Sequence, residues 1–460
     1  MGFQPVPTRS FASARSKIRL RLKASARRRA SFGGSRSRRV LKKRRDRRFA
    51  NHASIPALER RLPIVGSLSR GFAVIGQRVR TIYFDYNATT PLDPAVREAM
   101  APFLGANFGN PSSVHHVGRA ARAALDDARD RVAAFLGCKP AQIIFTSGGT
   151  EASNLAIFGA ARRQRPKGRH LITSAVEHHA VLHSFQYLAK HEGFDVTFLP
   201  VDDQGVVSPA ALEAALRAET TLVSVMAANN ETGVIQQVSA LGRICQERGT
   251  LFHTDAVQWF GKEPFSHIDQ FKADFVSICA HKFHGPKGAG ALFARSPLAF
   301  DPILFGGGHE NERRAGTENP ATIVGFAEAL ERFVKVPVFD RAKLAPLAAR
   351  LGTAALLAPD VNELGSRAKR LSNTVALTIK GCDSIALLAA LDLAGICASS
   401  GSACSSGSIE PSHVLLAMGL PPERANSLVR FSLGRDSALE EVEAVLAAFP
   451  AMVAQIRGSQ

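Results

Sequence analysis

The chain has 460 residues, of which 45% are hydrophobic and 21% charged, and its formal net charge is +19. This composition is typical of a globular protein of two or three domains, and no run of 18 or more apolar residues predicts a membrane-spanning helix. The charge does not indicate a nucleic-acid-binding core. Residues 1–80 hold 23 Lys and Arg against two acids, and subtracting these from the totals of 58 and 39 leaves 35 basic and 37 acidic side chains.

The N-terminal extension, residues 1–80, is rich in Arg and Ser and contains blocks such as Arg27-Arg28-Arg29. We expect it to be disordered, because like charges repel and little apolar surface is available for burial. Three interpretations stay open. The extension is a transit peptide to a mitochondrion or plastid, a basic arm that contacts nucleic acid or an anionic membrane, or upstream sequence translated from a misplaced start site.

Ordered structure is predicted to begin near Thr81, with a short strand and turn over 82–91 and helices over 94–104 and 117–136. Strands and helices then alternate. The predicted strands are 143–146, 170–173, 196–199, 222–227, 251–253, 274–279 and 289–293. The predicted helices between them are 151–163, 180–191, 209–217 and 239–248. Because the strands are almost continuously apolar, we predict an α/β fold with a mostly parallel seven-stranded sheet between helix layers.

The pattern changes after about Pro337 and predicts a smaller α+β domain. Its expected elements are helices 341–351, 384–393 and 439–456 and strands 373–379 and 429–433, with a Ser/Gly-rich loop over 399–408. The predicted organisation is therefore an extension (1–80), a large domain (81–336) whose first residues can pack on the small domain, and a small domain (337–460).

The six cysteines form no CxxC pair and show no metal-ligand spacing. In a chain of this length, such usage predicts a reducing compartment and mostly buried thiols. We therefore expect no metal site and a cytoplasmic location.

One lysine is placed where chemistry is expected. The apolar strand 274–279 ends at His281-Lys282, and a Gly/Pro turn follows. Open α/β sheets bind ligands at the carboxyl ends of their strands. A lysine there can lose its proton more easily than a surface lysine and attack a carbonyl. Taken alone, a lysine in this setting is far more often a surface residue in a turn, and the other motifs of the chain reverse that preference.

Other polar residues also follow predicted strands. The segment 146–151 opens a helix with Gly149 and Thr150, and such a helix N-terminus suits a phosphate. Asp255 can hold a protonated ring nitrogen, and His178 can stack on a flat ring. Each motif alone is compatible with a helix cap or a plain turn. Together with Lys282, they form the set that pyridoxal phosphate requires.

Two residues of the predicted small domain suit a substrate. Cys404 lies in the small, polar sequence Ser399–Gly407, where an exposed thiol can act as a nucleophile, although an incidental loop cysteine is also compatible. Arg430 lies on a predicted strand and can bind an amino-acid carboxylate through two hydrogen bonds or form an ion pair between layers.

From about Ile82 to its C-terminus, the chain resembles the group I cysteine desulfurases of the NifS/IscS type, fold-type-I pyridoxal-phosphate enzymes of the class-V aminotransferase family. The resemblance covers some 380 residues. Its motifs are Tyr83-Phe84-Asp85-Tyr86-Asn87-Ala88-Thr89-Thr90, Thr146-Ser147-Gly148-Gly149-Thr150-Glu151, Asn229-Asn230-Glu231-Thr232-Gly233, Ala280-His281-Lys282, Gly306-Gly307-Gly308-His309-Glu310, Arg314-Ala315-Gly316-Thr317-Glu318-Asn319, Ser399-Ser400-Gly401-Ser402-Ala403-Cys404 and Arg430-Phe431-Ser432-Leu433-Gly434-Arg435.

The resemblance implies a sulfurtransferase that removes sulfur from L-cysteine, giving L-alanine and a persulfide on Cys404. Lys282 would bind the cofactor covalently and move protons, with His178 beside it. Arg430 would bind the substrate carboxylate near Asn230. The sulfur would pass to an acceptor or iron–sulfur scaffold protein, and Cys404 could contact a nascent cluster there.

The resemblance also implies a binding site for pyridoxal phosphate. The residues concerned are Gly149, Thr150, His178, Asn230, Asp255, Gln258, His281, Lys282 and, from the second subunit of a homodimer, Thr317. Asp255 would hold the ring nitrogen, and Gln258 and Asn230 would lie near the 3-oxygen of the ring. Cys279 departs from the family, which usually has a phosphate-binding serine there. A thiol is the weaker hydrogen-bond donor.

Two rival functions stay open. One is a related pyridoxal-phosphate enzyme, such as a selenocysteine lyase or an aminotransferase, and the Cys404 loop discriminates against it. The other is a nucleic-acid-binding protein that uses residues 1–80, and the neutral core argues against it. No membrane partner is expected.

Overall fold

The computed structural model describes residues 81–401 and 410–458, which belong to one compact unit spanning residues 76–460. The predicted extension, 1–80, and Cys404 lie outside the described residues. The predicted division into a large and a small domain near residue 337 stays a prediction.

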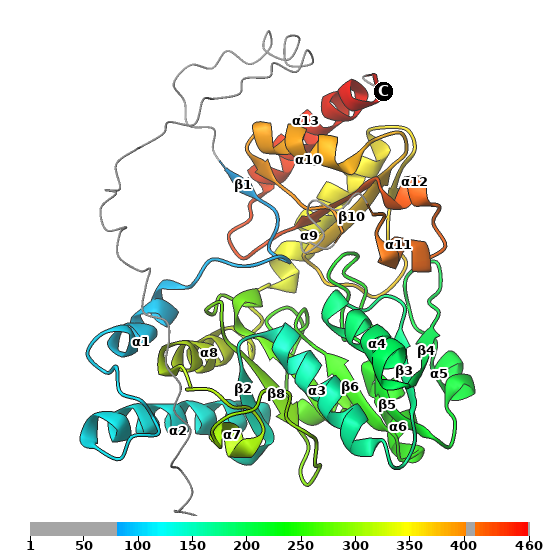
Figure 1. The fold of residues 1–460 in the computed structure, drawn as a ribbon. Helices are drawn as coiled ribbons and strands as arrows, with labels where there is room; N and C mark the ends of the chain where they lie inside the picture. Colours follow the sequence, from blue (N-terminus) through cyan, green and yellow to red (C-terminus); the bar gives the residue numbers. More distant parts are fainter. Residues whose placement is uncertain (1–80, 402–409, 459–460) are drawn as a thin grey trace, which may run out of the picture. The chain divides into compact units, whose positions relative to one another are not determined.

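A seven-stranded sheet forms the centre of residues 143–294, in the order β2-β8-β7-β6-β5-β3-β4 (Figure 1). Strands β3 to β7 pair in parallel, whereas β8 is antiparallel to both β7 and β2. Their bounds are β2 Ile143–Thr146, β3 His170–Ser174, β4 Asp195–Leu199, β5 Thr220–Ser224, β6 Leu251–Asp255, β7 Phe275–Cys279 and β8 Gly290–Ala294. The predicted α/β fold with a mostly parallel seven-stranded sheet is confirmed.

Alternate strand residues enter two different hydrophobic clusters, which explains why the strands are apolar on both faces. On β2, Ile143 and Phe145 join one cluster and Ile144 joins the other. Helices α3 (Gly149–Gln164) and α4 (His179–Glu192) pack into the cluster of Ile144 and lie in front of the sheet in Figure 1. The opposite cluster receives helices α1 Pro94–Leu104, α2 His116–Leu136, α5 Pro209–Ala215, α6 Val238–Glu247 and α8 Pro320–Phe333.

Helix α8 is not predicted from the sequence, although its start carries an ordinary signal. Asn319 caps it by accepting from the Thr322 N–H at 3.3 Å, and Pro320 occupies the first turn. The predicted strand 222–227 is also corrected, because β5 ends at Ser224. Its backbone still pairs with β6 beyond that point, since Ala227 N–H donates to the Asp255 carbonyl at 2.8 Å.

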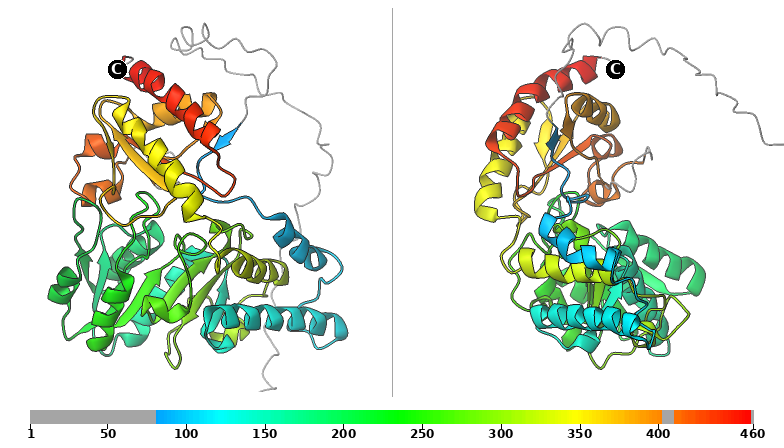
Figure 2. Two further views of the ribbon diagram at one scale, coloured as in Figure 1. Left: turned by 180° about the vertical axis from the view of Figure 1, so that it is seen from behind. Right: turned by 90° about the vertical axis from the view of Figure 1, so that its left-hand side faces the viewer.

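The C-terminal part contains a three-stranded antiparallel sheet in the order β12-β10-β9. Its strands are β9 Val361–Glu363, β10 Thr374–Ile379 and β12 Leu428–Ser432, and its helices are α9 Arg341–Gly352, α10 Ser384–Leu393, α11 His413–Ala417, α12 Pro422–Ala425 and α13 Leu439–Gly458. Helices α9 (yellow) and α13 (red) lie side by side beside this sheet (Figure 2). Strand β1 (Ile82–Tyr83) pairs in parallel with β11 (Ile396–Cys397), so the first described residues join this part.

None of the helices within residues 81–401 and 410–458 is both long enough and apolar enough to cross a membrane.

Candidate active site

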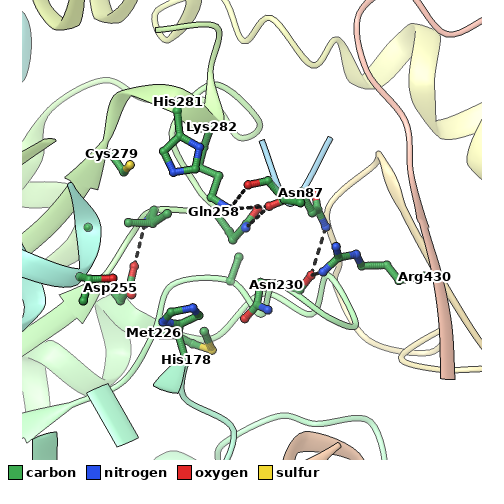
Figure 3. Close-up of a pocket in the computed structure, with 15 residues that line it drawn as sticks. Asn87, His178, Met226, Asn230, Asp255, Gln258, Cys279, His281, Lys282 and Arg430 are labelled. Carbon is green, nitrogen blue, oxygen red and sulfur yellow. Dashed lines mark hydrogen bonds between the residues drawn. The ribbon is translucent and has the colours of Figure 1, made fainter. Parts of the chain in front are cut away.

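A pocket of about 210 Å³ gathers most of the residues that the sequence singles out (Figure 3). Its lining residues are Asn87, Ala88, Gly149, Thr150, His178, Met226, Ala228, Asn230, Asp255, Val257, Gln258, Cys279, His281, Lys282 and Arg430. Every predicted site residue is among them except Thr317 and Cys404. The pocket lies where β6 and β7 end and α3 and α4 begin, the region where an open sheet is expected to bind ligands.

Lys282 reaches the pocket from a single 3₁₀ turn, Ala280–Lys282, directly after β7. Its Nζ donates to the backbone carbonyls of Asn87 at 2.6 Å and Ala88 at 2.8 Å. Burial, together with the nearby charge of Arg430, lowers the pKa of Lys282 to about 8. A substantial fraction of this amine is therefore neutral near physiological pH, which is the form that attacks a carbonyl.

Asp255 is the last residue of β6 and is buried. Burial raises the pKa of Asp255 to about 6, and the Val257 N–H at 2.9 Å and the charge of Lys282 limit the rise. The carboxylate is thus largely ionised at pH 7. A buried, ionised carboxylate suits a partner that carries a proton, such as a protonated ring nitrogen.

His178 caps the N-terminus of α4, where its Nδ1 accepts from the Ala180 N–H at 3.1 Å. Burial, and to a smaller extent the charge of Lys282, lowers the pKa of His178 to about 4. The ring is therefore neutral at pH 7. A neutral, half-buried imidazole facing the pocket is suited to stacking on an aromatic ring.

The first residues of α3, Gly149 and Thr150, line one side of the pocket and suit an anion. A Cβ on Gly149 would lie 2.5 Å from Val257 Cγ2, so only glycine lets the backbone come this close to its neighbour. The N-terminus of this 16-residue helix favours negative charge. The residues present therefore fit the phosphate of the predicted cofactor, with Thr150 and His281 beside it.

Two further residues of this region are uncharged. Burial lowers the pKa of His281 to about 4, and its Nδ1 lies 3.1 Å from Thr89 Oγ1. Burial raises the pKa of the Cys279 thiol, against the opposing effect of N–H groups of Gly149 and His281. Cys279 therefore adds no negative charge that would repel a phosphate.

Arg430 lies on β12 with its side chain 1% exposed. One guanidinium nitrogen donates to Asp85 Oδ1 at 2.7 Å, and another donates to the Asn230 carbonyl at 2.8 Å. Nε finds no hydrogen-bond partner anywhere in the described part of the chain. Arg430 therefore both forms an ion pair, with Asp85, and lines the pocket, so the two alternatives predicted for it are combined. Its Nε remains without a partner among the described residues.

Asn87 connects these groups, although no role for it is predicted from the sequence. Its backbone carbonyl accepts from Lys282 and from Gln258 Nε2 at 2.9 Å, and its side chain donates to Thr374 Oγ1 at 2.9 Å. Asn87 lies within the motif 83–90, but nothing in a sequence distinguishes an asparagine whose side chain hydrogen-bonds to buried groups from one in a plain turn. Met226 also lines the pocket, and no sequence signal marks it.

Thr317 is exposed, lies in the loop after α7 (His309–Glu312), and is not among the residues that line the pocket. Glu310 anchors this loop by accepting from Arg129 at 2.5 Å and from the Phe145 N–H at 3.1 Å. The predicted contribution of Thr317 to a second subunit stays a prediction.

The segment 402–409, with Cys404, is outside the described residues, but the chain just before it lies beside the pocket. Ser399 and Arg430 exchange backbone hydrogen bonds of 3.1 and 2.6 Å, and the Gly401 carbonyl accepts from the Arg430 side chain at 3.3 Å. Within residues 81–401 and 410–458, no group of three His, Cys, Asp or Glu side chains is arranged to hold a metal ion.

The family model described as aminotransferase class-V matches residues 82–445. Among curated proteins, the chain is 45% identical over 379 residues to a cysteine desulfurase IscS of Dictyoglomus turgidum, covering 82% of this chain and 96% of that protein. It is 44% identical over 378 residues to a cysteine desulfurase IscS of Methanosarcina thermophila, covering 82% of this chain and 93% of the relative.

Solved structures agree with this. A NifS-like protein aligns with a TM-score of 0.75 and 36% identity, covering 82% of this chain and all of its own. A structure described as SspA in complex with cysteine aligns with a TM-score of 0.69 and 34% identity, covering 78% of this chain and all of its own.

Proposed function

The chain belongs to the class-V aminotransferase family and is a cysteine desulfurase, and from this membership we propose that it uses pyridoxal phosphate to convert L-cysteine to L-alanine, with Cys404 as the sulfur acceptor. The observation that carries the proposal is the meeting of a lysine of lowered pKa, a buried carboxylate, a neutral histidine and a helix N-terminus in one pocket. The relative bound to cysteine supports the choice of substrate.

The pocket residues divide among the parts of the cofactor. Gly149, Thr150 and His281 would hold the phosphate, Asp255 the ring nitrogen, and Lys282 the aldehyde carbon. His178 would cover the ring, and Gln258 and Asn230 would lie near its 3-oxygen. When bound, the cofactor supplies an electron sink that makes the α-proton of an amino acid acidic.

Two residues act on the substrate. The guanidinium of Arg430, which lines the pocket, binds the carboxylate of L-cysteine and fixes the amino acid there. Lys282 Nζ moves a proton to and from the substrate carbon, a task that suits an amine with a pKa of about 8.

Cys404 completes the reaction. Its thiolate forms a bond to the substrate sulfur while the bond between that sulfur and the substrate β-carbon breaks. The carbon keeps the electron pair and takes up a proton, so alanine leaves and the enzyme retains a persulfide. The nearness of Ser399 and Gly401 to Arg430 supports this assignment.

The proposal includes a homodimer and a protein that accepts the sulfur, such as an iron–sulfur scaffold, in the cytoplasm. Large apolar side chains are exposed around α1, α2 and the loop before α7, including Leu104, Phe108, Val114 and Phe305. Burial of such side chains stabilises association. In this dimer, Thr317 would reach the phosphate of the partner subunit's cofactor.

Two measurements test the proposal. Reduction of the protein with borohydride, followed by digestion, should give a peptide that carries a pyridoxyl group on Lys282. Cys404→Ala should abolish sulfide release from L-cysteine and leave this labelling intact, whereas Cys138→Ala, a half-buried cysteine outside the pocket, should retain activity. Undiminished sulfide release by Cys404→Ala would exclude Cys404 as the acceptor, and an unlabelled Lys282 would exclude the cofactor assignment.

A further inference from the structure

A buried lysine that has no assigned task, Lys262, lies directly behind the pocket. Its side chain is 2% exposed, and no carboxylate among the described residues is within ion-pair distance of its Nζ. Burial, together with the charges of Lys282 and Arg430, lowers the pKa of Lys262. Placing an amine here is energetically costly, so the hydrogen bonds that it makes must compensate for its lost hydration.

Those hydrogen bonds go to two amide side chains. Lys262 Nζ donates to Asn87 Oδ1 at 2.7 Å and also donates to Gln258 Oε1. It lies 5.2 Å from the centre of the Phe339 ring. The amine is therefore held between the oxygen ends of two amides that line the pocket and an aromatic face.

These contacts decide which way each amide points. A side-chain amide has an accepting oxygen at one end and a donating NH₂ group at the other. Because the Lys262 amine presents N–H groups to both amides, each must direct its oxygen toward Lys262 and its NH₂ group away from it. The NH₂ of Gln258 donates to the Asn87 carbonyl at 2.9 Å, and Gln258 is among the residues that line the pocket (Figure 3). An amide NH₂ has a second hydrogen, which this bond leaves over for a ligand.

We propose that Lys262 is a positioning residue that keeps the donor end of the Gln258 amide facing the pocket, where it hydrogen-bonds the 3-oxygen of pyridoxal phosphate. The inference rests on the proposed function and deepens it. Without Lys262, only the hydrogen bond to the Asn87 carbonyl still orients the Gln258 amide, so the amide can turn over at the cost of that one bond and bring its own oxygen toward the 3-oxygen. The pocket then loses one donor and gains a repulsive contact.

The test compares two cofactors that differ in one atom. Cofactor-free protein is titrated with pyridoxal phosphate and with 3-deoxypyridoxal phosphate, which lacks the 3-oxygen. We expect Lys262→Met to weaken binding of pyridoxal phosphate roughly 10-fold to 100-fold, the range of one hydrogen bond to a charged oxygen, and to leave binding of the deoxy compound unchanged. Lys272→Met removes a surface lysine paired with Asp269 and should change neither affinity.

A second comparison tests the route through Gln258. Gln258→Leu should show the same selective loss as Lys262→Met, and the double variant should lose no more than Gln258→Leu alone. If Lys262→Met weakens the binding of both compounds equally, Lys262 has only a structural role. If it leaves both affinities unchanged, the proposal is overturned.

Folding is monitored by thermal denaturation of every variant. If Lys262→Met does not fold, Lys262→Gln, which keeps one donor group for the two amide oxygens, enters the same comparison and should show a smaller loss in the same direction. Failure of the unaltered protein to bind pyridoxal phosphate would instead overturn the proposed function, and this inference with it.

Discussion

In the cofactor-free protein, Lys282 should lose its proton near pH 8 rather than near the ordinary lysine value of 10.5. At pH 7.5 about 24% of the amines are then neutral, against about 0.1% for an unperturbed lysine, a gain of about two hundredfold in the reactive form. The cause is chiefly burial, and the charge of Arg430 adds to it. Arg430→Met should therefore raise the pKa of Lys282, since it removes a positive charge and leaves the Asp85 carboxylate unpaired.

The assay is competitive acetylation. Trace deuterated acetic anhydride labels the cofactor-free protein at a series of pH values, and unlabelled reagent then completes the reaction under denaturing conditions. Mass spectrometry of the peptide containing Lys282 gives the neutral fraction at each pH, and the same protein labelled in denaturant provides the reference. The reasoning fails if the midpoint for the folded protein coincides with that of the denatured sample, or if Arg430→Met lowers it.

Three other predictions concern single residues. Burial raises the pKa of Glu177 to about 8, so the stability that Glu177 provides while protonated is lost as the pH rises from about 4.5 through 8. Glu177→Gln should therefore match the native protein in free energy of unfolding near pH 4.5 and exceed it by up to about 5 kcal/mol at pH 9. A difference between the two proteins that does not vary with pH would contradict this. Gly149→Ala should lower the free energy of unfolding, measured by thermal denaturation, by about 1–3 kcal/mol, because the new Cβ would clash with Val257 Cγ2. If the same loss persists in the double variant with Val257→Ala, this clash is not the cause of the loss. Arg430→Lys, which loses the planar pair of donors, should raise KM for L-cysteine roughly 10-fold to 100-fold, and an unchanged KM would remove Arg430 from carboxylate binding.

The sequence predicts the central sheet well because strands such as β2, β7 and β8 are buried and largely apolar on both faces. The run 274–279 is a clear case, since its end also locates Lys282. Helix α8 was missed, although Asn319 and Pro320 signal its start, because no strand follows it to complete the alternating pattern. The end of β5 was misplaced because Val225 to Ala227 stay apolar and stay bonded to β6 after the regular strand has ended.

Most of the candidate site was predicted because its residues follow strands and carry unusual side chains. Asn87 and Lys262 were not, for a physical reason. Their importance comes from hydrogen bonds between segments about 175 residues apart, and neither residue type signals burial. A lysine in a turn is normally solvated, and the contacts with Phe339 and Gln258 make Lys262 an interior group. Tertiary contacts of this kind leave no local pattern.

The segment from Ile82 to Ala88 has a practical consequence for handling this protein. At one end it is hydrogen-bonded to β11, and a few residues later its carbonyls hold the amine of Lys282. Shortened versions made for crystallisation, or versions with an affinity tag in place of the N-terminal extension, should therefore keep every residue from Thr81 onward. A truncation even a few residues later would free the backbone carbonyls that hold the Lys282 amine, and the purified protein would be inactive.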